Sequence, residues 1–258
     1  MERVERSGLA YYRNENWRGL RHGIFTRRGG ASRGQWTSLN LGGNIGDDSA
    51  AVGENHRRMY DAVKAQGERA ATTWLVHGTD VLVVDGPPNG RSWLAKADGM
   101  ITGQPDIPLV MRFADCVPLL LYDPAKGAIG LGHAGWRGTV KGIAAKMVSA
   151  MGNAYGSSPQ DIQVVIGPAI SQPNYQIGSE VVEAAFKYFG EAAGVVRIDP
   201  KDGAAFLDLW LANQLDFQRV GVEDVEVLRL CTYEHSDDFF SHRAEEGKTG
   251  RFGVIISL

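Results

Sequence analysis

The sequence predicts an α+β fold in one domain that spans residues 1–258. Predicted helices and strands follow one another without the strict alternation that is typical of a doubly wound sheet. Several predicted strands are apolar throughout, as strands covered on both faces tend to be. The 33 glycines are spread along the chain, and no low-complexity tract or internal repeat marks a linker. A polar stretch at 151–161 therefore indicates a surface loop rather than a domain boundary.

The clearest predicted helix covers residues 139–151, where apolar residues recur at helical spacing and form one stripe. Thr139 is placed to cap its start, and Gly152 is placed to end it. Further helices are predicted where similar patterns follow polar starts, at 50–67, 179–190 and 205–221.

Strands are predicted where short runs rich in branched and apolar residues lie between turn signals. These runs are residues 74–85, 106–114, 117–123, 128–134, 162–167, 225–232 and 252–258.

Composition limits the classes of function. A net charge of −3 and an isoelectric point of about 6.1 argue against nucleic acid as the main partner. The charged N-terminus lacks the apolar core of a secretory signal, and no segment approaches the roughly 18–20 apolar residues of a membrane span. Two cysteines are too few for a disulfide framework. We therefore expect a cytoplasmic enzyme with reduced thiols, and the sequence carries no signal for an oligomeric state.

The stretch "GLGHAGWRGT" at 130–139 predicts a functional turn between a strand and a helix. Its glycines permit a tight turn and close approach to the backbone. Arg137 is expected beside a helix N-terminus, where unpaired N–H groups favour an anion. His133 is expected at the end of the preceding strand, with its imidazole at the edge of the sheet.

Two further residues have the chemistry to join His133. His77 follows an apolar run and precedes a glycine, and Cys116 lies between two predicted strands. Two imidazoles and one thiolate form a ligand set for zinc or copper with a fourth position open. Taken singly, Cys116 is also explained as a buried small hydrophobe, and so is Cys231. The spacing alone does not show that the three ligands meet.

The motifs "FTRRGGAS", "SLNLGGNIGDD", "VHGTDV", "ADGMIT", "ADCVPLLL", "HAGWRGT", "IGPAI" and "FFSHRAEEGKTGR" occur in the order found in the YfiH family. The chain resembles this family, also called the polyphenol oxidase or laccase-domain family, from about residue 20 to its C-terminus. The resemblance implies mixed sheets packed together with helices on the outer faces. It also implies a zinc site made by His77, Cys116 and His133. The chain departs from the family's "FFSYRR" at His242 and Ala244.

The resemblance implies a zinc-dependent purine nucleoside phosphorylase that cleaves adenosine, inosine and methylthioadenosine with phosphate and also deaminates adenosine. Phosphate has to be held by guanidinium groups, for which Arg27, Arg137 and Arg243 are the candidates.

Three alternatives stay open. A copper-dependent polyphenol oxidase is disfavoured because the few histidines include no His-x-His pair for a copper cluster. A metal-free hydrolase would use Cys116 as its nucleophile with a histidine base. A non-catalytic role in editing cell-wall precursors has no local support in the sequence.

Overall fold

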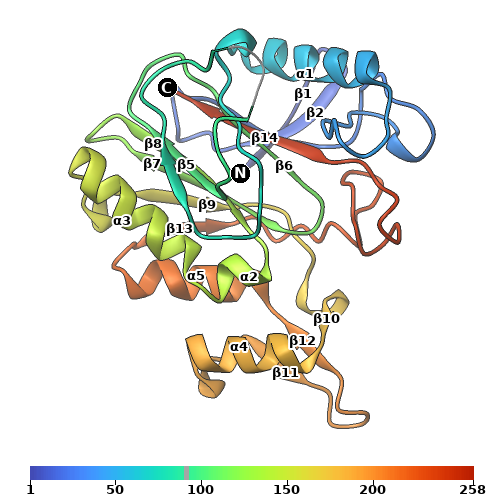
Figure 1. Cartoon of the computed structure of the whole chain (residues 1–258), viewed down its shortest axis with the longest axis vertical. Coiled ribbons are helices and arrows are strands. Elements are labelled where there is room, and N and C mark those ends of the chain that lie inside the picture. The colour runs from blue at the N-terminus through green and yellow to red at the C-terminus, as the bar shows by residue number, and fades with distance from the viewer. Residues whose placement is uncertain (90–92) are drawn as a thin grey trace.

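The chain folds into four layers, as a computed structural model of residues 1–89 and 93–258 shows (Figure 1). A helix covers one face of a first sheet, the first sheet packs on a second, and further helices cover the outer face of the second sheet. The expected α+β class, with packed mixed sheets between outer helices, is confirmed.

The first sheet is antiparallel and has the strand order β1-β2-β3-β14-β6. Its strands are Glu2–Arg6, Leu9–Arg13, Arg21–Phe25, Phe252–Ser257 and Leu109–Phe113, in that order. Helix α1, Ser49–Val63, lies on its outer face.

The second sheet is mixed and has the order β13-β9-β7-β8-β5-β4. Its strands are Asp224–Val227, Gln163–Ile166, Val117–Asp123, Ala128–Ala134, Gly99–Thr102 and Val81–Val83. Helices α2, α3 and α5 lie on its outer face, at Trp136–Thr139, Ile143–Tyr155 and Leu209–Arg219.

A smaller extension carries helix α4, Ser179–Phe189, beside a sheet of order β10-β12-β11 (Figure 1). These strands are Gln176–Ile177, Ala205–Leu207 and Val196–Ile198. No helix in the described part of the chain is long and apolar enough to cross a membrane.

The continuous apolar strands are explained by the central position of the two sheets. On β7, Leu119 and Leu121 pack toward α3, whereas Leu120 between them packs toward the first sheet. On β14, Val254 faces the second sheet, and its neighbour Ile255 faces α1. Because successive side chains point to opposite faces of a strand, both faces must be apolar when both are covered.

The predicted helix at 139–151 is placed wrongly. The chain forms the single turn α2, breaks at Gly142, which has a φ of +74°, and then forms α3 as far as Tyr155. Thr139 is not a cap, because it is the last residue of α2 and the N-cap positions of α2 and α3 are held by Gly135 and Gly142. Its hydroxyl accepts a hydrogen bond from Asn213. Gly156, rather than Gly152, has the left-handed conformation that ends the helix.

Other boundaries also differ from the sequence prediction. The helix predicted over 50–67 ends at Val63, and the one predicted over 205–221 begins as strand β12 before α5. The strand predicted over 74–85 is reduced to β4, because the chain bends at residues 76–78, where three N–H groups bind a carboxylate of another segment. Strands 117–123 and 128–134 are confirmed to the residue.

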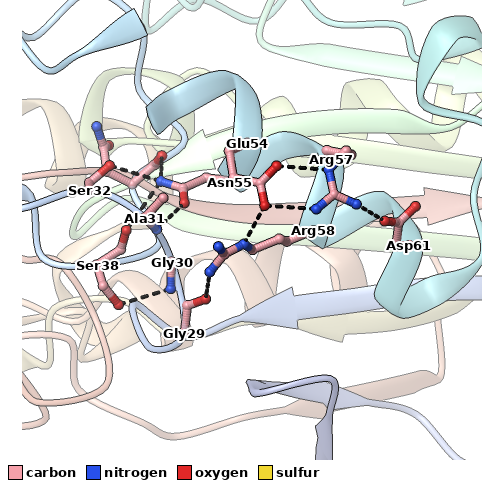
Figure 2. Close-up of polar contacts among 11 residues, drawn as sticks. Gly29, Gly30, Ala31, Ser32, Ser38, Glu54, Asn55, Arg57, Arg58 and Asp61 are labelled. Atoms are coloured by element: carbon pink, nitrogen blue, oxygen red, sulfur yellow. Dashed lines mark hydrogen bonds and ion pairs between the residues drawn. The ribbon is translucent and has the colours of Figure 1, made fainter. Parts of the chain in front are cut away.

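Helix α1 is fixed to the preceding loop by one buried side chain, Asn55 (Figure 2). The Asn55 amide donates to the hydroxyl of Ser32 and to the carbonyl groups of Ser38 and Asn40. Its own oxygen accepts from the backbone N–H of Ala31 at 2.7 Å. These bonds position the segment that continues into residues 41–45 beside the helix.

Candidate metal centre

The structure brings His77, Cys116 and His133 together at one edge of the layer between the sheets. Their ligand atoms all lie within 4.8 Å of one another, and the two imidazole centroids are 5.0 Å apart. The topology explains the meeting of the last two. Strands β7 and β8 are antiparallel, and Val117 pairs with Ala134, so Cys116 and His133 lie at the same end of the pair.

The third residue, His77, lies on a bend of the chain that Asp98 stabilises. The buried carboxylate of Asp98 accepts from the backbone N–H groups of Val76, His77 and Gly78 at 3.1, 3.0 and 2.7 Å. His77 itself has a φ of +57°, a conformation that non-glycine residues rarely adopt. Asp98 therefore stabilises the unusual backbone on which this ligand depends.

Asp98 also orients the second imidazole. Its Oδ1 lies 2.9 Å from Nδ1 of His133, and its backbone carbonyl accepts from the His133 N–H at 2.7 Å. With Nδ1 bonded to the carboxylate, Nε2 of His133 is left to face Cys116. A carboxylate behind a histidine ligand is the common arrangement that fixes the ring and raises its basicity.

Gly135 lies against His77 and Cys116, and no larger residue fits at this position. A Cβ atom at this position would lie 2.8 Å from Cδ2 of His77 and 3.1 Å from Sγ of Cys116. Backbone conformation is not the reason, since the φ of Gly135 is −76°. The glycine expected to allow close approach is thus required for the approach of the two ligand side chains.

The electrostatics of the site favour a thiolate. Burial opposes ionisation of the Cys116 thiol, but the adjacent His133 and His77 rings outweigh it and lower the pKa of Cys116 to about 6. Burial likewise disfavours a charged ring at His133, but Cys116 and Asp98 raise the pKa of His133 to about 9. Without a metal, the pair is therefore a thiolate and an imidazolium at neutral pH.

This donor set fits a zinc ion. Zinc is bound by thiolate at about 2.3 Å and by imidazole at about 2.0–2.1 Å, which puts tetrahedral ligand atoms roughly 3.3–3.6 Å apart. The separations of up to 4.8 Å here require only small side-chain adjustments. His77 is exposed, so the fourth position would open to solvent. Copper is also bound by two histidines and one cysteine.

Two of the three predicted anion-binding arginines lie near this centre. Burial raises the pKa of the Tyr175 hydroxyl, as does the charge of Cys116, and the charges of Arg243 and Arg137 lower it. These three charged groups therefore lie around Tyr175. The Arg243 guanidinium lies 5.3 Å from the Tyr175 ring and donates to the Gln176 carbonyl.

The surroundings of Arg137 differ from the expectation in one respect. Arg137 does not start a long helix, because α2 is a single turn and α3 begins at Ile143. Its guanidinium stacks 4.2 Å from the Trp136 ring and lies 3.8 Å from the Glu180 carboxylate, largely in solvent. The expected contribution of a helix dipole is therefore wrong, whereas the charge itself is accessible.

Arg27 directs its guanidinium to protein acceptors. It donates to the carbonyls of Thr37 and Ser236 and to the carboxylate of Glu245, and it stacks 4.2 Å from the Phe240 ring. Its side chain is 14% exposed, against 53% for Arg137. These bonds tie the loop at residue 27 to the C-terminal segment that carries Arg243.

Asp98 and Asp115 are residues of the site that the sequence did not reveal. Asp115 has a φ of +84°, accepts from the Thr232 hydroxyl at 2.6 Å and from the Arg243 N–H at 2.7 Å, and so positions the loop of Arg243. The only sequence signal for either was its place in a family motif, "ADG" for Asp98 and "ADC" for Asp115.

The other described histidines do not join the candidate metal centre. In residues 1–89 and 93–258, His77, Cys116 and His133 form the one group of at least three metal-binding side chains. His22 is buried and accepts the Asn14 N–H, and burial lowers its pKa to about 4.

Comparison with known proteins identifies the relatives of this chain. The family model described as multi-copper polyphenol oxidoreductase laccase matches residues 21–258. A purine nucleoside phosphorylase of Bacteroides thetaiotaomicron is 33% identical over 96% of both chains. Purine nucleoside phosphorylase YlmD of Geobacillus stearothermophilus is 37% identical over 91% of this chain and 88% of its own.

Solved structures agree over nearly the whole chain. YfiH of Bacillus licheniformis has a TM-score of 0.92 at 31% identity and covers 99% of this chain and 98% of its own. YlmD of Geobacillus stearothermophilus has a TM-score of 0.92 at 34% identity, over 98% of this chain and 97% of its own.

Replacing the cysteine of the centre tests whether it is a metal ligand. We expect Cys116→Ala to lose bound metal, because the thiolate supplies one of three donors, and Cys231→Ala to retain it. Elemental analysis of protein purified without added metal measures both. Full metal content in Cys116→Ala would contradict the assignment.

The pH dependence of alkylation tests the charge state of the metal-free centre. Because the pKa of Cys116 is lowered, its thiolate persists as the pH falls and disappears only below about pH 6. The rate of iodoacetamide labelling in chelator-treated protein should therefore reach half of its maximum near pH 6, rather than near the ~8.5 of an ordinary thiol. The control is Cys116→Ser, in which the buried Cys231 should label slowly. A midpoint above pH 8 would show that His133 and Cys116 do not interact as described.

Proposed function

Since the chain belongs to the family described as multi-copper polyphenol oxidoreductase laccase, and since its relatives are named purine nucleoside phosphorylases, we propose that it is a zinc-dependent purine nucleoside phosphorylase. Its substrates are adenosine, inosine and methylthioadenosine together with phosphate. The observation that carries the proposal is the grouping of His77, Cys116 and His133 beside two accessible arginines.

In this proposal, the three side chains hold the metal, and a zinc ion there would supply a Lewis acid. Asp98 keeps the Nδ1–H of His133 bonded, so that Nε2 faces the metal position. Gly135 leaves room for His77 and Cys116 to approach each other.

Phosphate is assigned to Arg137 and Arg243. Both guanidiniums are exposed near Cys116, and neither is closed off by a tight ion pair. Guanidinium groups match the geometry of phosphate oxygens. Arg27 was also a candidate, but its bonds to Glu245 and two carbonyl groups favour a role in positioning the loop of Arg243.

The reaction exchanges one bond at the anomeric carbon. A phosphate oxygen forms a bond to C1′ of the ribose while the C1′–N9 bond breaks. The electron pair of that bond stays on the purine, which takes up the proton that hydrogen phosphate gives up. The products are the free base and ribose 1-phosphate, or 5-methylthioribose 1-phosphate when methylthioadenosine is the substrate. Deamination of adenosine is proposed at the same centre, because a Lewis acid also activates water.

The alternatives are weighed by the same side chains. A multi-copper oxidase needs several metal-binding groups, and residues 1–89 and 93–258 contain one such group of three. A metal-free hydrolase has some support, because Cys116 and His133 form a thiolate–imidazolium pair. An editing role without turnover would retain the metal ligands but show no product.

We expect inosine to be split to hypoxanthine only when phosphate is present. In Arg137→Ala, the KM for phosphate should rise ~10–150-fold, as expected when a charged hydrogen bond is lost, and the KM for inosine should change less. The matched control is Arg197→Ala, because Arg197 also stacks 4.2 Å from an aromatic ring and lies 3.7 Å from a carboxylate, but in the extension.

Product analysis with and without phosphate makes the measurement. Equal cleavage without phosphate would refute phosphorolysis. An unchanged KM for phosphate in both Arg137→Ala and Arg243→Ala would refute the assignment of the arginines. Full activity in metal-free protein would favour the cysteine hydrolase.

A further inference from the structure

A cavity of about 920 Å³ lies beside the metal centre, on the other face of strand β6. Val110 of β6 packs toward α1, whereas Met111 and Phe113 pack between the sheets, where Phe113 lies 5.5 Å from the His133 ring. Arg112 therefore points to the α1 side. The cavity is open to solvent and is lined by that helix, by the 41–45 loop and by the segment that leads toward His77.

Arg112 has no charged partner in the described part of the chain. Its guanidinium makes one long hydrogen bond, 3.5 Å to the Thr73 carbonyl, and the nearby Tyr60 raises its pKa against the effect of burial. Burial lowers the pKa of Arg112, although an arginine stays protonated. A half-buried cation without an anion is costly and calls for a partner.

Arg251 lines the same cavity and adds a second positive charge to that of Arg112. It lies two residues before Gly253, the register partner of Arg112, so both side chains lie on the same face of the sheet. Its guanidinium donates to the carbonyls of Thr249 and Gly250 and makes no ion pair with a described carboxylate. Burial lowers the pKa of Arg251, against the more distant charges of Cys116, Asp115 and Glu245, which raise it. Gly42 makes room for it, since a Cβ there would lie 2.9 Å from Cγ of Arg251.

The other residues that line the cavity suit a ligand that has both an anionic group and a ring. Among the described residues that line the cavity there is no aspartate or glutamate, although the chain as a whole has a net charge of −3. The buried Oγ1 of Thr72 has no hydrogen-bond partner. Trp74 and Trp93 are 41% and 43% exposed, and their rings meet edge to face at 4.4 Å.

We infer that this cavity binds a phosphate monoester of a ring-bearing compound, with the phosphate on Arg112 and Arg251 and the ring against Trp74 and Trp93. A phosphate group has enough oxygens to accept hydrogen bonds from both guanidiniums, and its negative charge supplies the anion that Arg112 lacks among the described residues. The indoles provide a large apolar surface for a planar ring, such as a nucleotide base. The site is separate from the proposed phosphorolysis centre and does not depend on its activity.

Calorimetric titration with adenosine 5′-monophosphate, adenosine and orthophosphate tests this inference. The monophosphate should bind at least about tenfold more tightly than either fragment, since it alone engages both ends of the cavity. Arg112→Gln should weaken its binding by about tenfold or more and leave adenosine unchanged. Trp74→Ala should weaken the monophosphate but not orthophosphate.

Matched variants separate this site from the metal centre and from general effects of charge. Arg69→Gln removes a half-buried arginine that also donates to a carbonyl group but does not line the cavity, and it should bind normally. Arg137→Ala should also bind the monophosphate normally, whether or not phosphorolysis is lost, because Arg137 does not line the cavity. Because Arg112 has no ion-pair partner in residues 1–89 and 93–258, Arg112→Gln should melt no lower than the unmodified protein.

The inference is overturned by an unchanged affinity for the monophosphate in both Arg112→Gln and Arg251→Gln. It is also overturned by a monophosphate that binds no more tightly than adenosine. If orthophosphate binds as tightly as the monophosphate, the ring-bearing ligand is refuted. Loss of binding in Arg137→Ala would place the ligand at the metal centre instead.

Discussion

The carboxylate of Asp98 is the interaction on which the rest of the site depends. It binds the N–H groups of residues 76–78, which places His77 at the centre in a rarely adopted conformation, and it bonds to Nδ1 of His133. One buried group thus fixes two of the three candidate ligands, which come from different segments of the chain. Burial opposes its ionisation, but the hydrogen bonds from His133 and Gly78 outweigh it and lower the pKa of Asp98. The carboxylate is therefore charged at neutral pH and remains a strong acceptor.

Strand β6 lies between the candidate metal centre and the cavity because the fold has two sheets back to back. On β6, Phe113 faces the second sheet and contacts His133, whereas Arg112 beside it faces α1 and lines the cavity. The period of two along a strand therefore separates a centre with a thiolate and imidazoles from a cavity with two guanidiniums. Burial lowers the pKa of Arg251, and the negative charges of Cys116 and Asp115 oppose this effect, so the centre and the cavity are close enough to interact electrostatically.

Strands 117–123 and 128–134 could be predicted to the residue because both faces are buried and their sequences are apolar throughout. The same strands place Cys116 and His133, so this part of the site followed from local sequence and the family motifs. Asp98 did not, because its function depends on segments 20 and 35 residues away. The break at Gly142 was missed since the apolar stripe continues past it, with Val140 before and Ile143 after. In the sequence, Arg112 does not differ from any other arginine on a strand. Only the structure shows that no anionic partner lies beside it among the described residues.

Metal affinity in Asp98→Asn tests the central claim most directly. Asparagine keeps the shape of the side chain but loses the charge that orders residues 76–78 and orients His133. Titration of chelator-treated protein with zinc should show an affinity about 10–100-fold lower than that of the unmodified protein, as is typical when the partner of a ligand is lost. Asp80→Asn, an exposed neighbour whose carbonyl group rather than its carboxylate accepts from Asp98 and Gly99, should bind zinc normally. Equal zinc affinity in Asp98→Asn and the unmodified protein would contradict the claim that Asp98 holds the centre together.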